Sequence, residues 1–289
     1  MYPIRALAAA TYGEITRRPL YYILLLSFAV GVLLSKTLTL WSFYQERAMV
    51  REMGIATLTF WGYLIIVLTS GIVVTQELED RTAVTLLAKP IRRSDFLLGK
   101  YFGILLSLVP GLFVLSGVLF VTLFAMSFGL LHVSDRALVE GVAAGRSAFG
   151  VVWSAVWRDF VLTQGGVVLQ GAFLSFLQAS LLASLAVSFS AFFPTVVSVG
   201  ATTLVFILGN ISSYMVASVE NTGVAPLAWA ARGISYVTPN LGYFNLQANF
   251  SEGTIISLKY LALAAVYAAL FAGAVFLVSC SLFQRREVR

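Results

Sequence analysis

Long apolar stretches alternate with short polar ones along this chain. A membrane-spanning helix needs about 20 apolar residues, and in hydrocarbon a helix satisfies its own backbone hydrogen bonds. The pattern therefore predicts an all-α integral membrane protein, a single domain over 1–289 with six transmembrane helices. Stretches of about 30 residues have room to tilt or kink, and Pro110 is a candidate kink. The six stretches are roughly Leu20–Leu40, Ile55–Val74, Tyr101–Leu131, Val161–Phe193, Thr195–Val216 and Thr254–Phe283.

Composition agrees with this pattern and excludes an ordinary soluble domain. Hydrophobic residues make up 59% of the chain and the mean hydropathy is +0.90, whereas soluble domains are about 45–50% apolar. The apolar run after Arg17 and Arg18 exceeds the roughly 7–15 residues of a signal-peptide core. We therefore expect it to be an uncleaved first span.

Positive charge indicates the orientation in the membrane. The net charge is +6, and the tightest basic clusters lie before the first span, after the second and at the C-terminus. Cytoplasmic loops of membrane proteins carry such an excess, so both termini are predicted to be cytoplasmic. The same rule explains the net positive charge, so nucleic-acid binding is not needed to account for it. Membrane lipids are the expected partners of these basic clusters.

Two outer segments, 132–162 and 217–253, are longer than simple turns. Trp153 and Trp157 stand four residues apart, so they share a helix face and predict an aromatic anchor at the membrane surface, with substrate contact as the alternative. In the second segment, Pro239 and Gly242 interrupt regular helix. Its aromatic residues indicate an interfacial belt or a short re-entrant element.

Residues that could carry catalysis are missing from the sequence. The chain has one cysteine, Cys280, and one histidine, His132. An internal disulfide is excluded, and a metal site built on the two is not expected. No GxxxxGK[ST] phosphate-binding loop occurs. We expect no enzyme activity and no cofactor in this chain. The predicted span interiors hold essentially no ionisable residues, which argues against a proton-coupled carrier.

Neutral polar side chains mark the fourth and fifth spans. Small residues at four-residue spacing let helices approach closely, so helix packing is one interpretation of the serines. A polar stripe along a translocation path is the other, and the sequence leaves both open. The residues concerned are Gln178, Ser180, Ser184, Ser188 and Asn210.

The densest charge lies between the second and third spans, from Gln76 to Lys100. Thr82 can cap a short helix over 83–89, which Pro90 stops. Arg92 and Arg93 follow, and Ser94 can cap the next helix. This predicts a helix–turn–helix elbow on the cytoplasmic surface over 76–100. Physical reasoning alone leaves two roles open, an orienting loop on anionic lipid and a docking element for a soluble partner.

The spacing of this segment resembles a signature of ABC-2 type transporter permeases. The signature is E-x-E-x-x-T, seven residues, P-x-x-R, five residues and G-K, met here by Glu77, Glu79, Thr82, Pro90, Arg93, Gly99 and Lys100. The permease of the copper-site maturation system for nitrous oxide reductase is one such protein. The resemblance extends to Glu14 and Arg18, which match an amphipathic entry helix of the family and imply such a helix over residues 1–19, and to Pro239–Leu246. One departure is Arg81, where family members usually carry glycine.

The resemblance implies the membrane subunit of an ATP-driven transporter, most simply an exporter in a bacterial inner membrane. Its elbow would be a coupling helix that docks on a separate ATPase subunit, which holds ATP and Mg. Two permease chains and two ATPase chains would assemble. A stand-alone secondary carrier or channel, and a non-transporting scaffold subunit, are the alternatives. The implied contact residues are Glu77, Glu79, Arg81, Thr82, Val84, Leu86, Leu87, Pro90, Arg92, Arg93, Gly99 and Lys100.

Overall fold

The computed structural model describes the helical body of the chain. No β-strand occurs in this described part. It covers residues 2–38, 46–71, 93–129, 160–222, 238–246 and 253–285, with 147, 150, 153, 154, 157, 233 and 235. Its helices are α1 (Tyr2–Arg17), α2 (Pro19–Leu38), α3 (Glu46–Thr69), α6 (Arg93–Gly129), the π-helix η3 (Phe160–Gly165), α9 (Gly166–Phe192), α10 (Thr195–Thr222), the 3₁₀ helix η4 (Leu241–Phe244) and α13 (Leu258–Arg285).

Helix α9 forms the centre of the bundle and packs against α3, α6, α10 and α13. In its most apolar stretch 78% of residues are buried, against 39% or less for α6, α10 and α13. Small side chains explain how one helix holds so many neighbours, because they let backbones approach. At Gly171, for example, an added Cβ would lie 2.7 Å from Ile55 Cδ1 of α3.

Five described helices are long and apolar enough to cross a membrane, namely α3, α6, α9, α10 and α13. The chain is therefore an all-α, multi-pass membrane protein. The first predicted span corresponds to α2, which meets the same test only together with α1. The two are bent by 63°, and counting this pair as one broken span raises the number to six.

Proline sets the two sharp breaks between successive helices. The residue before a proline is disfavoured in the α conformation, so helices tend to end there. Arg18 before Pro19 separates α1 from α2. Phe193 before Pro194 is extended, with φ −119° and ψ 153°, and ends α9. Pro110 behaves differently, since α6 continues through it as one helix.

Helices α3 and α6 begin earlier than their apolar stretches predict, at Glu46 and Arg93. The added turns are mixed in polarity but bury one side, including Val50 in α3 and Phe96 and Leu97 in α6. Tertiary packing thus extends both helices beyond the hydrophobic run. Two charged residues that the pattern places outside the spans, Arg51 and Lys100, consequently become helical and buried.

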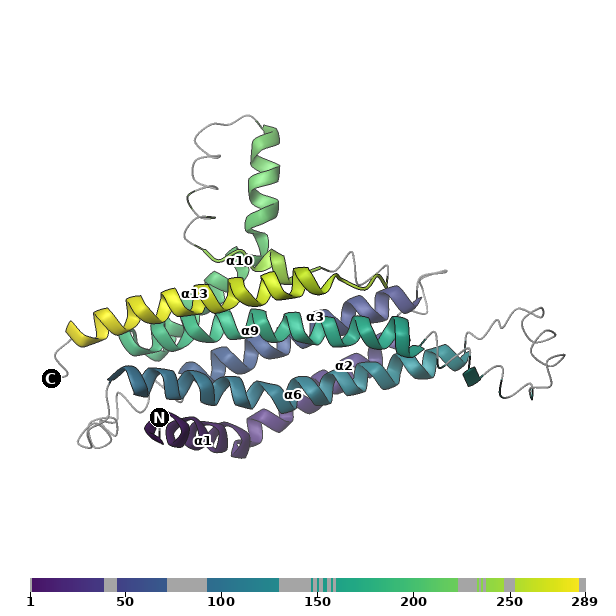
Figure 1. Ribbon diagram of the computed structural model, residues 1–289, viewed down its shortest axis with the longest axis horizontal. Coiled ribbons are helices and arrows are strands. Elements are labelled where there is room, and N and C mark those ends of the chain that lie inside the picture. Colours follow the sequence, from purple (N-terminus) through teal and green to yellow (C-terminus); the bar gives the residue numbers. More distant parts are fainter. Residues whose placement is uncertain are drawn as a thin grey trace.

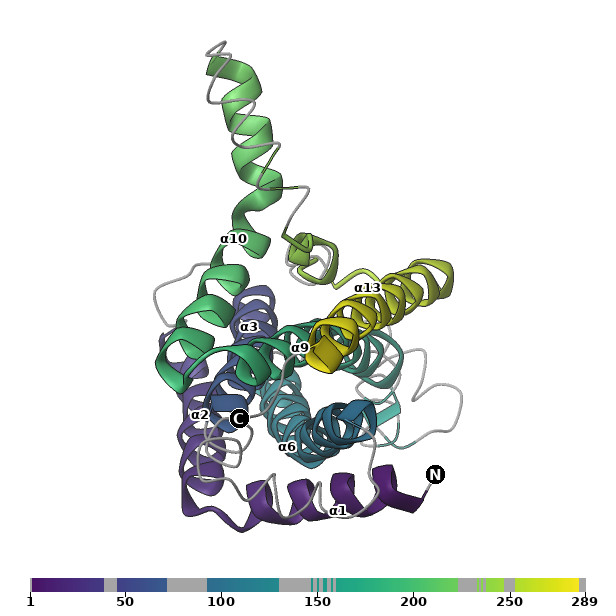
Figure 2. The ribbon, with the colours of Figure 1, turned by 90° about the vertical axis from the view of Figure 1, so that its left-hand side faces the viewer.

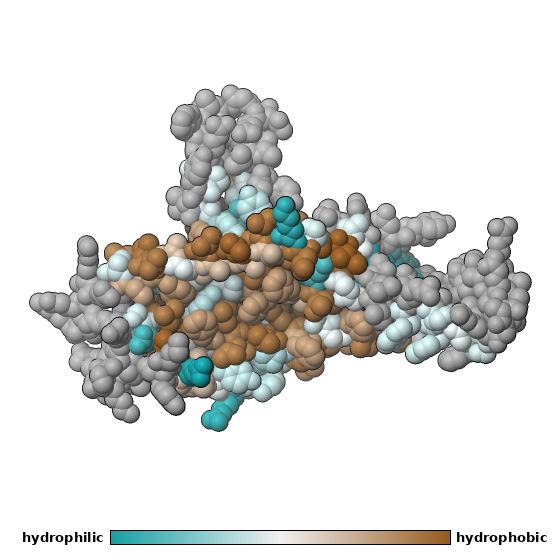
Figure 3. Space-filling view, viewed as in Figure 1, coloured by the Kyte–Doolittle hydropathy of each residue, from teal (hydrophilic) through white to brown (hydrophobic). Residues whose placement is uncertain are grey.

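Most helices run along the long axis of the molecule, and α1 lies across them (Figures 1 and 2). The start of α6, the end of α13 and α1 gather at the same end (Figure 1). An apolar surface covers the middle of the bundle in this view (Figure 3). The second half of α10 stands away from the other helices in both ribbon views. A helix lying across a bundle end is typical of an element in the membrane plane.

Candidate coupling site at the start of helix α6

The predicted elbow meets the described bundle at the start of α6. Its helix over 83–89, its cap Thr82 and its stop Pro90 lie outside the described residues. So do the expected contact residues Glu77, Glu79, Arg81, Val84, Leu86, Leu87 and Arg92. Arg93 begins α6, and Gly99 and Lys100 lie within it. The structure therefore shows how the C-terminal part of the elbow, residues 93–100, is anchored to the bundle; we call this part the root of the elbow.

Helix α6 starts one residue before the predicted cap. Arg93 is its first residue and Ser94 its second, so Ser94 is inside the helix and is not the N-cap. The Ser94 hydroxyl bonds instead to the Asp95 carboxylate, with 3.5 Å between Oγ and Oδ1. Asp95 lies in the first turn, where its negative charge complements the helix dipole.

Lys100 is buried at the root of the elbow, with 3% of its surface exposed. Its ammonium lies 5.9 Å from the centre of the Phe96 ring, one turn earlier on α6. A cation over an aromatic face is attracted by the ring quadrupole, more strongly where water is excluded. The lysine of the G-K pair is thus part of the interior packing, which holds the first turns of α6 in place.

Gly99 and Gly103 form the crossing point of α6 with α1. A Cβ at Gly99 would lie 2.6 Å from Leu7 Cβ. At Gly103 it would lie 2.8 Å from Thr11 Cγ2 and 2.9 Å from the Ala8 carbonyl oxygen. Glycines four residues apart allow this close approach of two helices. The G-x-x-x-G spacing in the sequence could have revealed this contact, whereas sequence reasoning gave Gly99 only a role by resemblance.

The bend after α1 is held by two side-chain contacts. Arg18 pairs with Glu14 one turn earlier, with 2.6 Å between Nη2 and Oε1. The Tyr21 hydroxyl donates to the Ser107 carbonyl of α6 at 2.8 Å. A backbone carbonyl oxygen has two lone pairs, so the Ser107 carbonyl can accept this donor while it remains part of the helix. Helix α1 and the start of α2 are thus both fixed to α6.

The polar residues of the fourth and fifth spans lie inside the bundle of a single chain. Gln178 and Asn210 meet across α9 and α10, with 3.3 Å between Nε2 and Oδ1. Ser180 and Ser184 donate to carbonyls of their own helix, at Leu177 and Leu181, and Ser188 donates to Ser184. The three serines are at most 7% exposed. In this conformation they fill the α9 interface, and their role along a translocation path stays a prediction.

Further hydroxyl groups join neighbouring helices near the same interface. Thr59 of α3 bonds to Ser175 of α9 at 2.9 Å. The Tyr63 hydroxyl donates to Thr203 of α10 at 2.9 Å, and its ring stacks on Phe206 with centroids 4.1 Å apart. Polar pairs of this kind hold helices in register where the surrounding lipid offers no hydrophobic driving force.

A buried arginine near the start of α3 is the feature that sequence reasoning missed. Arg51 is 7% exposed and donates from Nη1 to Gln164 Oε1 of η3 at 2.9 Å. Gly253 lies against the guanidinium at φ +71°, a left-handed conformation that favours glycine. Gln170 of α9 holds the adjoining segment by accepting from the Ile256 N–H at 2.8 Å and donating to its carbonyl at 3.0 Å.

The outer aromatic residues divide between packing and exposure. Trp153 and Trp157 are exposed and stack with centroids 6.2 Å apart, as their spacing predicts. In η4, Leu241 and Phe244 are buried whereas Tyr243 is exposed. Leu241 sits against Gly209 of α10, where an added Cβ would lie 2.8 Å from its Cγ. This part of the Pro239–Leu246 segment is a packed corner of the bundle.

Within the described residues, no group of three His, Cys, Asp or Glu side chains could hold a metal ion. Compared with known proteins, the chain matches no family model and no curated protein. The features that bear on function are the membrane bundle, the charged segment and its anchor at α6.

Proposed function

We propose that this chain is the membrane subunit of an ATP-driven ABC transporter, with ATP hydrolysis in a separate subunit. The observation that carries the proposal is the charged segment from Glu77 to Arg93, with most of the spaced motif, between the membrane-crossing stretches of α3 and α6. Such a segment has to face water, because burying its charges in hydrocarbon is too costly. By resemblance, it docks on the ATPase as a coupling helix.

The anchoring of α6 supports this role. A coupling element can move the bundle only if it is joined to it rigidly. A packed protein interior has low compressibility, so it passes a displacement on instead of absorbing it. The root of the elbow is clamped through Gly99, Lys100 and Gly103 and through α1. Movement of the elbow would therefore carry α6 and α1 together, and α6 would pass it to α9, against which it packs.

The orientation of the bundle fits the same proposal. Arg5, Arg17, the start of α6 and the end of α13 belong to elements at one end of the molecule. By the positive-inside rule this end is cytoplasmic, where ATP is present. We assign the chain to a bacterial inner membrane, as an exporter subunit that pairs with a second permease copy and two ATPase subunits.

The distribution of charge favours this reading over a secondary carrier. A proton-coupled carrier needs an ionisable relay group in the membrane. Among the described residues of the five crossing helices as the membrane test bounds them, the carboxylates are Glu46, Glu52 and Asp95, all within seven residues of a helix start. The buried cations Arg51 and Lys100 are held by Gln164 and Phe96 in structural contacts.

Co-purification tests the proposed function. The full-length chain, tagged and extracted from its native membrane in mild detergent, is expected to bring down an ABC ATPase and vanadate-sensitive ATP hydrolysis. The tagged chain extracted under conditions that strip peripheral subunits serves as the control. A purified chain that transports a solute in vesicles with no ATPase subunit present would instead establish the carrier alternative.

A further inference from the structure

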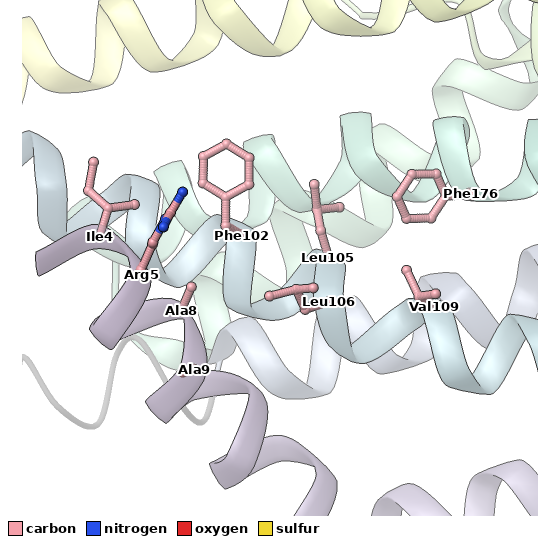
Figure 4. Close-up of a pocket in the computed structure, with 9 residues that line it drawn as sticks. All are labelled: Ile4, Arg5, Ala8, Ala9, Phe102, Leu105, Leu106, Val109 and Phe176. Carbon is pink, nitrogen blue, oxygen red and sulfur yellow. The ribbon is translucent and has the colours of Figure 1, made fainter. Parts of the chain in front are cut away.

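An apolar groove opens between α1 and α6, beside the crossing at Gly103. It has a volume of about 580 Å³, within the roughly 300–1,000 Å³ of typical ligand sites. Its walls are the side chains of Ala8, Phe102, Leu105 and Leu106, and Phe176 of α9 closes one end. Arg5 is the single charged residue among the described residues of the lining. Figure 4 shows Arg5 near Phe102 at one end, with Val109 and Phe176 at the other.

The groove is charged at one end and apolar along the rest of its length, so it matches an amphiphilic ligand that lies along the bundle. Arg5 projects from α1 (Figure 4), and α1 lies across the end of the molecule (Figure 2). Phe102 is about 13 Å along α6 from Arg93, at about 1.5 Å per residue, and Val109 is about 10 Å further into the bundle. The groove thus has a cation, Arg5, at one end, and its apolar wall extends from there along α6 toward the middle of the bundle.

Arg5 is not neutralised by the acid of its own helix. Glu14 is the acidic residue of α1, and it pairs with Arg18 at 2.6 Å. Arg5 is exposed beside the groove. A guanidinium on a flexible stem can reach a phosphate at headgroup level while its methylenes stay on the apolar wall.

The same surface continues as a lipid-facing stripe. Phe102, Leu106, Val109 and Phe113 are spaced by three or four residues on α6, and each is 46% or more exposed. A second protein helix in the groove would cover this stripe but would bring an apolar face against Arg5. A phospholipid meets both requirements, with its chain on the apolar wall and its phosphate on the guanidinium.

We propose that the groove is a binding site for one anionic phospholipid, whose phosphate contacts Arg5 and whose acyl chain lies on α6 and Phe176. The lipid fills the space beside the close α1–α6 crossing and seats α1 against the bundle. The site lies next to the root of the elbow but does not depend on the proposed ATPase. Its occupant is a resident lipid and not a transported substrate.

Native mass spectrometry of the full-length chain tests the site. The chain is exchanged into detergent with equal amounts of phosphatidylglycerol and phosphatidylcholine. We expect one retained phosphatidylglycerol per chain in preference to phosphatidylcholine. Arg5→Gln is expected to reduce retention about fivefold, because it removes the direct contact between the guanidinium and the lipid phosphate. Ala9→Trp, which fills the groove from α1, is expected to reduce it at least as much.

Arg17→Gln is the matched control, because Arg17 is exposed on the same helix but does not line the groove. Its retention is expected to stay within about twofold of the original chain. Equal losses in Arg5→Gln and Arg17→Gln would overturn the proposal in favour of diffuse charge attraction. Equal retention of both lipids would overturn it as well. So would a dimer that holds no lipid and that Ala9→Trp converts to monomer, because a second copy would then occupy the groove.

Discussion

Charge reversal of Arg92 and Arg93 to glutamate is expected to reduce ATP hydrolysis by the assembled complex at least about tenfold. In the proposed assembly both arginines face the ATPase, and truncating or reversing one partner of a close interfacial charge pair costs about 2–5 kcal/mol, where each 1.4 kcal/mol is about tenfold. The measurement is vanadate-sensitive ATP hydrolysis in proteoliposomes, together with the amount of ATPase subunit that co-elutes with the chain.

Arg285→Glu combined with Arg286→Glu is the matched control. This pair also consists of adjacent arginines on the same predicted side of the membrane: Arg285 is the last residue of α13, and Arg286 follows it in the sequence. Its hydrolysis rate is expected to stay within about twofold of the original, since it carries no predicted docking contact. If Arg92→Glu with Arg93→Glu left hydrolysis and assembly at the original level, the elbow would not be the coupling element.

The substitution Gly103→Ala is expected to destabilise the chain by about 1–3 kcal/mol, the usual cost of overpacking. Its Cβ would meet Thr11 and the Ala8 carbonyl oxygen, and a backbone atom cannot turn aside as a side chain can. At about 2–4 °C per kcal/mol for a domain of this size, Tm should fall by roughly 2–12 °C. The measurement is thermal unfolding of the full-length chain in detergent, followed by intrinsic fluorescence.

Gly117→Ala is the control on the same helix. A Cβ there meets nothing within 4 Å, and replacing a helical glycine by alanine removes an entropic cost of about 0.5–1 kcal/mol. Its Tm is expected to be unchanged or slightly raised. Equal losses in the two variants would show that the α1–α6 crossing at Gly103 does not contribute to stability in this way.

The apolar pattern predicted most of the fold, because lipid leaves few alternatives to a helix. The described part of each of the six predicted stretches contains a helix, and five of these helices are long and apolar enough to cross a membrane. The break before Thr195 is confirmed at Phe193 and Pro194. The start of α3 was less accurate, since its first turns are polar on one side and are stabilised by packing, whereas the cap predicted at Ser94 is one residue from the observed start of α6. A hydropathy pattern does not predict such packing, because the packing depends on residues distant in the sequence.

The candidate site was predicted in part. Sequence spacing identified Gly99 and Lys100, but it gave no reason for the burial of Lys100 near Phe96. The contact of Arg51 with Gln164 joins residues more than 100 positions apart, and no local pattern signals it. The groove likewise requires α1 and α6 to cross, a geometry set by Gly103 together with the bend at Pro19.

Site-specific photo-cross-linking from the elbow tests the coupling proposal most directly. A photoreactive amino acid replaces Leu86, a predicted docking residue, and in a matched variant it replaces Trp157, which is exposed on the predicted outer side. In intact cells the account predicts a cross-link from position 86 to an ABC ATPase subunit and none from position 157. Cross-links from position 86 to lipid alone, with the ATPase absent from both variants, would contradict it.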